Sequence, residues 1–203
     1  MILIKMNSKN INLIINLAIV ILEIIGFTLV FNELGITSLE YYTEESNLLL
    51  LISSIIFIIY LYKNNELPSW FKSFRYIAIV STTLTLIIVL TVLSWTTDFG
   101  LHHLLFNGSM LYHHTLCPIL AILSFVFVEK YENLNTIHGL YFTIIYAIIM
   151  IILNVLKVVE GPYPFLRIYE QPIIHSIIWT VIIFAITYLI ALILKKVNGK
   201  VII

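Results

Sequence analysis

A short polar cluster and a histidine pair are the side chains of this sequence that could do chemistry together. Thr43, Ser46 and Asn47 are spaced i, i+3, i+4, so they share one face of a predicted helix. His113 and His114 begin another apolar stretch. A threonine hydroxyl becomes a useful nucleophile when a neighbouring base accepts its proton, and a neutral imidazole can be that base. The two segments therefore predict a nucleophilic Thr–His site if their helix ends meet.

The same residues also have purely structural interpretations. Thr43 could be the N-cap of its helix, with the acidic residues that follow it complementing the helix dipole. The histidine pair follows Ser109, a plausible N-cap, and could simply hydrogen-bond to lipid headgroups or water at a helix end. Pro118 cannot donate to the carbonyl of His114, so we expect a kink within a turn of the pair.

The elements that position these residues are predicted to be transmembrane helices. Hydrophobic residues make up 61% of the 203 and charged residues only 11%, whereas soluble domains are about 45–50% apolar. A helix needs about 20 mostly apolar residues to span a bilayer, and open sheet edges cannot be satisfied in lipid. The sequence therefore predicts an all-α, six-helix transmembrane bundle that forms one domain over residues 1–203. The predicted helices cover about 12–31, 46–62, 76–95, 110–128, 137–156 and 173–194.

The basic residues predict how this bundle is oriented. Nine of the eleven Lys and Arg residues fall on one side of the six-helix arrangement: Lys5, Lys9, Lys63, Lys72, Arg75, Lys130, Lys195, Lys196 and Lys200. Basic residues mark the cytoplasmic side of membrane proteins. We therefore predict a multi-pass plasma-membrane protein with both termini in the cytoplasm. Five of the six histidines then lie at the outer face, together with three loops that carry acidic residues, 32–45, 96–109 and 157–172. We expect the site at this face.

The outer loops and helix ends also supply candidates for supporting roles. A third group usually orients the base of a nucleophilic site, and Glu44, Asp98 and Glu160 are the acids available for that role. Ser46, Asn47 and backbone amides could donate to an oxyanion. The other candidates for the pocket wall are His114, Asn154 and Tyr163.

Three segments in order resemble a known group of membrane proteins. Tyr-Thr-x-x-Ser-Asn-Leu-Leu at 42–49, His-His-Thr-x-x-Pro at 113–118 and Gly-Pro-Tyr-Pro-Phe-Leu at 161–166 resemble the prokaryotic six-transmembrane ("Pr-six-Pr") family. More distantly, they resemble the eukaryotic androgen-induced protein and androgen-dependent TFPI-regulating protein family. Eukaryotic members hydrolyse fatty acid esters of hydroxy fatty acids with a Thr nucleophile and a His. The resemblance implies Thr43 as nucleophile, His113 as base and a lipophilic ester as substrate.

One departure from that family pattern concerns charge. Glu44 and Glu45 stand where the prokaryotic relatives tend to have uncharged residues and the eukaryotic ones apolar residues. This difference bears on the electrostatics of the pocket, and so on the substrate.

Two other functional classes are compatible with the sequence. Histidines and acids crowd the outer face and would suit Zn or Fe, although no HExxH-like spacing is present. A transporter or ion path could instead use Glu23, Asn154 and Lys157, since ionisable residues inside membranes often line such paths. Glu23 should then face the interior and pair with Asn154 or Lys157. A structural membrane protein without catalysis is the remaining alternative.

The sequence favours no cofactor and no nucleic-acid partner. It contains no Gly-rich phosphate loop or nucleotide signature, and its formal net charge is zero. We therefore predict no bound cofactor and no bound metal. A lone Cys117 excludes an internal disulfide, and in an apolar helix it is most simply a packing residue. The predicted partners are membrane lipids and a lipophilic ester.

Overall fold

The computed structural model describes residues 8–198 and 200, and over that part of the chain it contains helices and loops but no strand. The predicted all-α class is thus confirmed. Lys5 lies outside the described residues. The long helices are α1 (Ser8–Leu34), α2 (Tyr42–Lys63), α3 (Ser69–Ile88), α6 (Cys117–Phe127), α7 (Tyr141–Val155) and α8 (Ile173–Val197). Between them lie the short helices α4 (Ser94–Thr96) and α5 (Leu101–Phe106), the π-helical turns η2 (Val89–Leu93) and η3 (Leu111–Leu116), and the 3₁₀ turns η1 (Gly35–Glu40), η4 (Thr136–Leu140) and η5 (Pro164–Leu166).

Five of the helical stretches are long and apolar enough to cross a membrane. They are Ser8–Glu40, Tyr42–Lys63, Ser69–Thr96, Thr136–Val155 and Ile173–Val197. The fourth predicted span, 110–128, corresponds to the shorter apolar stretch Leu111–Phe127, whereas about 20 residues normally span the hydrocarbon core. Large apolar side chains are exposed along α7 and α8, as expected for helices that face lipid. The length and composition of these helices are compatible with an integral membrane protein.

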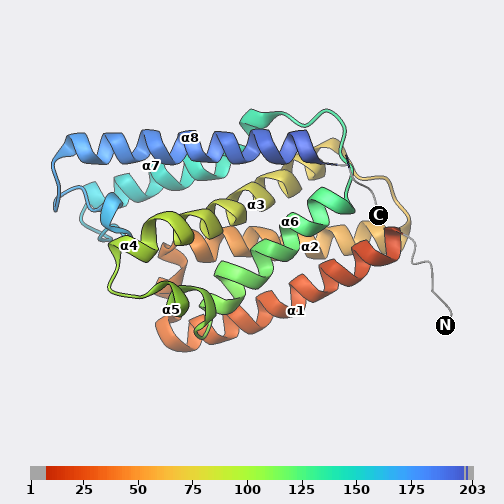
Figure 1. Ribbon diagram of the computed structural model, residues 1–203, viewed down its shortest axis with the longest axis horizontal. Helices are drawn as coiled ribbons and strands as arrows, with labels where there is room; N and C mark the ends of the chain where they lie inside the picture. Colours follow the sequence, from red (N-terminus) through yellow and green to blue (C-terminus); the bar gives the residue numbers. More distant parts are fainter. Residues whose placement is uncertain (1–7, 199, 201–203) are drawn as a thin grey trace.

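The helices run back and forth along the long axis of the bundle (Figure 1). The α1–α2 and α7–α8 connections, together with α4 and α5, lie at one end, which we call the site end. The α2–α3 and α6–α7 connections, the start of α1 and the end of α8 lie at the other, which we call the termini end. Thus the three loops that the sequence predicts at a common face do lie at one end of the molecule.

A buried ion pair holds the termini end together. Arg75 is fully buried, and its guanidinium lies 2.8 Å from the Glu129 carboxylate. It also donates to Ser53, Ser54 and Asn16. Arg75 lies at the termini end with the other basic residues of its predicted side, but it is buried in the bundle and not in a loop, because α3 begins at Ser69 rather than near residue 76. A buried charge is tolerable only when it is paired and hydrogen-bonded, and Arg75 is both.

An apolar layer separates this ion pair from the polar residues of the site end. Ile19, Leu50 and Ala121 are fully buried, on α1, α2 and α6 respectively. Ile19 and Leu50 each lie about one helical turn from buried polar residues on both sides along their own helices, as Ile19 does between Asn16 and Glu23. Ala121 lies about one turn from Ser124 on one side and from Cys117 on the other. The buried polar side chains of these three helices are therefore interrupted by hydrocarbon.

Candidate active site

Thr43 lies in the first turn of α2 and points into the bundle. The N-cap of α2 is Tyr41, which has extended backbone and makes no side-chain cap bond, so Thr43 is not the N-cap. Its side chain is buried at the site end, 6% exposed. A helix capped by Thr43 would begin at Glu44, whereas α2 begins at Tyr42. The Thr43 hydroxyl therefore does not cap the helix and can face other helices.

The imidazole beside Thr43 is that of His114. Thr43 Oγ1 lies 3.4 Å from His114 Nε2, and His114 Nδ1 lies 2.7 Å from the carbonyl oxygen of Leu104. Since a carbonyl only accepts, Nδ1 carries the proton and donates it, which leaves Nε2 as an acceptor facing the hydroxyl. His114 therefore has the tautomer that a general base for Thr43 requires. The group that orients it is a backbone carbonyl of α5 rather than an acid.

The helix irregularity predicted at the histidine pair takes the form of a π-helical turn. η3 covers Leu111–Leu116 and passes directly into α6 at Cys117. Pro118 has no N–H to bond the carbonyl of His114, so the backbone can widen here at little cost. π-turns are frequent at functional sites. Neighbouring residues on a helix point about 100° apart, so a change of register here decides which of His113 and His114 faces α2.

His113 is held elsewhere, between two buried carboxylates. Its Nδ1 lies 2.6 Å from Glu44 Oε2, and its Nε2 lies 3.3 Å from Glu23 Oε2. The side chains of His113 and Glu23 are no more than 1% exposed. Neither contact has the alignment of a hydrogen bond, so both are best described as close polar contacts. The partner of Glu23 is thus His113 and not Asn154 or Lys157, because Gly26 lets α1 approach η3 closely.

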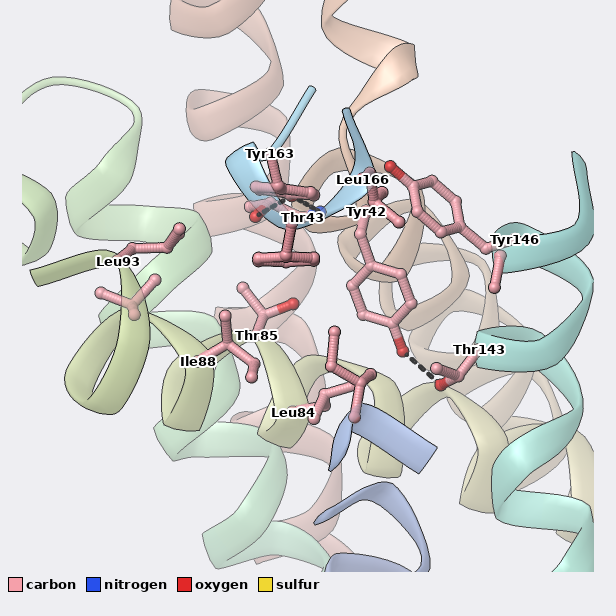
Figure 2. Close-up of a pocket in the computed structure, with 14 residues that line it drawn as sticks. Tyr42, Thr43, Leu84, Thr85, Ile88, Leu93, Thr143, Tyr146, Tyr163 and Leu166 are labelled. Atoms are coloured by element: carbon pink, nitrogen blue, oxygen red, sulfur yellow. Dashed lines mark hydrogen bonds between the residues drawn. The ribbon is translucent and has the colours of Figure 1, made fainter. Parts of the chain in front are cut away.

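Tyr163 closes the site from the α7–α8 loop. Its hydroxyl accepts from the Thr43 backbone N–H at 3.3 Å and lies 3.4 Å from Thr43 Oγ1. Burial raises the pKa of the Tyr163 phenol, so it keeps its proton at neutral pH and can donate. The loop folds back tightly at Gly161, where a Cβ would stand 2.5 Å from the backbone of Leu166. Figure 2 shows Tyr163 above Thr43.

An apolar cavity of about 60 Å³ opens beside Thr43. It runs between α3, α7, α8 and the η5 loop (Figure 2). Its wall consists of Tyr42, Thr43, Leu84, Thr85, Ile88, Val89, Leu93, Thr143, Tyr146, Ala147, Tyr163, Phe165, Leu166 and Ile183. Tyr42 and Thr143 bond each other at 2.8 Å, so these two hydroxyls satisfy one another within the wall. The cavity suits a narrow hydrocarbon group better than a charged one.

Ser46 and Asn47 both hydrogen-bond to the backbone carbonyl of Thr43. Ser46 Oγ donates to the Thr43 carbonyl at 3.0 Å. Asn47 Nδ2 donates to the carbonyls of both Thr43 and His113, at 2.8 and 3.0 Å. Asn47 thereby ties the α2 end to η3. Both side chains donate to backbone carbonyls. They therefore position the site, whereas the sequence predicted them as donors to an oxyanion.

The remaining candidates from the sequence lie outside this cluster. Asp98 and Glu160 are exposed. Asn154 is buried but bonds the loop backbone at Val159 and Ile168. The Leu104 carbonyl was not predicted, and no side-chain pattern could have indicated it, because a backbone group leaves no signature in the sequence.

Neither a metal group nor a known relative adds to this geometry. Among residues 8–198 and 200, no three His, Cys, Asp or Glu side chains are placed to hold a metal ion together. The chain was compared with family models, curated proteins and solved structures, and none of them matches it.

Proposed function

We propose that this protein is a multi-pass hydrolase of lipophilic esters in the plasma membrane, with Thr43 as nucleophile and His114 as general base. The observation that carries the proposal is the 3.4 Å contact of the Thr43 hydroxyl with His114 Nε2, at a threonine that lines an apolar cavity. Such contacts are often long before substrate binds. The three sequence motifs that resemble the six-transmembrane family add support, since residues from all three meet at this site.

The proposed reaction proceeds in two steps. His114 Nε2 takes the Thr43 proton as Oγ1 attacks the ester carbonyl carbon, and the carbonyl electrons move to its oxygen. The tetrahedral intermediate then breaks its bond to the alcohol, which leaves with the proton from His114. Water attacks the acyl-Thr43 ester with His114 again as base, which releases the fatty acid and restores Thr43. The Leu104 carbonyl stabilises the protonated imidazole through Nδ1–H.

Tyr163 is the proposed oxyanion donor. Its hydroxyl accepts from the Thr43 amide, so its own proton is available for the developing charge. The apolar cavity would hold the acyl chain next to the carbonyl. Because the helices around it face lipid, a hydrophobic ester could reach the site from the bilayer.

The test is hydrolysis of long-chain 4-nitrophenyl esters by the purified protein, with fluorophosphonate labelling of the nucleophile. Thr43→Val should abolish labelling, whereas Thr43→Ser should keep it. His114→Gln should lower kcat by about 10²–10⁴-fold, and Tyr163→Phe by about 10²–10³-fold. Thr28→Val, at an exposed α1 threonine whose hydroxyl donates to the Ile24 carbonyl, is the control.

Two results would contradict this assignment. Undiminished turnover in folded Thr43→Val would remove the nucleophile and with it the enzyme proposal. Loss of turnover in folded His113→Gln, with His114→Gln still active, would return the base role to His113. Folding of each variant is checked by its thermal unfolding midpoint, so that loss of structure is not mistaken for loss of chemistry.

A further inference from the structure

A second cavity is lined by the end of α7 and by other residues of the α7–α8 loop, and unlike the first it has charged side chains in its wall. It measures about 340 Å³, within the roughly 300–1,000 Å³ of small-molecule sites. Two cations and two carboxylates line it, together with uncharged groups: Asn154, Lys157, Val159, Glu160, Gly161, Arg167, Tyr169 and Glu170. The lining of this cavity is therefore more polar than that of the first, and its four charged side chains carry no net charge.

The backbone at the end of α7 fixes where Lys157 stands. Lys157 has a left-handed φ of 57°, and its N–H bonds the Asn154 carbonyl while Val158 N–H bonds the Leu153 carbonyl. This is the Schellman pattern, in which the left-handed position is usually Gly. A lysine here accepts backbone strain that a glycine would avoid. Its ammonium lies over the Tyr169 ring, 5.4 Å from the centroid, and so stays at the cavity wall.

Arg167 also lines the cavity, and its guanidinium has more N–H donors than the hydrogen bonds described next use. Its Nε donates to the Gly161 carbonyl and its Nη1 to Glu170, both at 3.2 Å. A guanidinium has five N–H donors, so within the described residues these bonds leave donors for a ligand. Glu160 is exposed at the same cavity. The site can thus offer donors to an anionic group and carboxylates to a cationic one.

The position of the loop indicates where such a ligand comes from. The loop joins α7 and α8, which are both apolar enough to cross a membrane, so residues 156–172 lie at the membrane surface among lipid headgroups. The same loop lines the apolar cavity through Tyr163, Phe165 and Leu166. One connection therefore has a charged pocket at headgroup level and an apolar pocket beneath it.

We propose that this charged cavity binds the phosphoammonium zwitterion of a membrane phospholipid, with a phosphoethanolamine headgroup as its simplest form. Lys157 and Arg167 contact the phosphate, which carries the negative charge. Glu160 and Glu170 contact the ammonium. A balanced set of two cations and two carboxylates matches a zwitterion, whereas a purely anionic headgroup would meet the carboxylates unfavourably. The proposal holds whether or not Thr43 is catalytic.

The test measures binding of short-chain lipids to the purified full chain in detergent by native mass spectrometry. Dihexanoyl phosphatidylethanolamine should bind more tightly than dihexanoyl phosphatidylglycerol. Lys157→Gln should weaken binding of both lipids by about two- to fivefold, the range of one exposed charge contact. Glu160→Gln should weaken binding of the ethanolamine lipid alone, so that the difference in affinity between the two lipids becomes smaller. Lys63→Gln and Glu66→Gln, exposed at the termini end, are the matched controls and should change neither affinity.

The pattern of selectivity decides the outcome. Equal binding of the two lipids, equal binding of dihexanoylglycerol without a headgroup, or an unchanged lipid preference in Glu160→Gln would overturn the zwitterion site. Competition with free phosphoethanolamine shows whether the ligand is a soluble zwitterion or a membrane lipid. Displacement of the lipid at similar concentrations assigns a soluble zwitterion, and failure to displace it assigns a membrane lipid; both keep the proposed chemistry. Neither Lys157 nor Glu160 belongs to the Thr43 cluster, so ester hydrolysis should persist in both variants.

Discussion

His113 contacts two buried carboxyl groups that come from two different helices. It lies between Glu23 of α1 and Glu44 of α2, and all three side chains are at least nine-tenths buried. The imidazole thus gives each of two buried carboxyl groups a polar neighbour inside the bundle. His113 is therefore best described as a structural clamp beside the proposed base.

Removal of that clamp should be costly. His113→Ala is expected to lower the free energy of unfolding by about 1–3 kcal/mol, because it leaves buried carboxyl oxygens without a polar neighbour. Adding Glu23→Gln should recover part of the loss, since it removes one of the two carboxyl groups. Thermal or denaturant unfolding in detergent measures both effects, with exposed His102→Ala as control. A His113→Ala protein as stable as the parent would show that the carboxylates do not depend on the imidazole.

At the residue scale the sequence indicated the proposed nucleophile, Thr43, but not the imidazole beside it. Thr43, Ser46 and Asn47 could be grouped because helix periodicity alone places them on one face. The choice between His113 and His114 depends on the π-turn and on how closely α1 approaches, and neither is encoded in local spacing. The same holds for Glu23, whose partner comes from another helix 90 positions along the chain. Contacts across helices follow from packing, which a single sequence does not display.

At the scale of elements, α1 approaches η3 through a glycine. A Cβ on Gly26 would lie 2.3 Å from His113 Nε2 and 3.0 Å from Tyr112 Cβ. The imidazole has little room to move, because the Phe27 ring lies on it with centroids 4.7 Å apart and Glu44 contacts its far side. Gly26 therefore sets the spacing between the first helix and the histidine pair.

Gly26→Ala should accordingly destabilise the protein by about 1–3 kcal/mol, the usual cost of overpacking. It should also lower ester turnover, because displacement of η3 moves His114 relative to Thr43. Gly100→Ala is the control, since no atom lies within 4 Å of a Cβ at that position. The comparison needs unfolding midpoints and kcat for both variants. Equal effects in the two would mean that loss of glycine itself, and not the contact with His113, is responsible.

Helix ends were harder to predict than helix cores. The apolar runs located the helices because the bilayer demands hydrocarbon, but α3 begins at Ser69 and carries Lys72 and Arg75 within its first turns. These charges are compatible with a helix because Arg75 is paired with Glu129 and the remaining polar residues lie near a membrane surface. Hydropathy alone ends a predicted span at the first charge, whereas the hydrogen-bonded helix continues through it.

For the whole molecule, charge and fold together predict an orientation. Of the nine basic residues predicted on one side, Lys5 lies outside the described residues and Arg75 is buried. The other seven lie at the termini end, against Lys157 and Arg167 at the site end. The bias is still strong, and Lys and Arg near span ends set topology. The termini end should therefore face the cytoplasm and the site end the outside.

Cysteine accessibility in intact cells tests that orientation. Asp98→Cys and Glu170→Cys, both at exposed site-end positions, should react with a membrane-impermeant maleimide added outside. Lys63→Cys and Glu132→Cys, exposed at the termini end, should react only after permeabilisation. The native Cys117 is buried, so the unaltered chain gives the background. The reverse pattern would invert the topology and turn the Thr43 site toward the cytoplasm. Labelling at both ends without permeabilisation would mean that the basic residues do not fix one orientation.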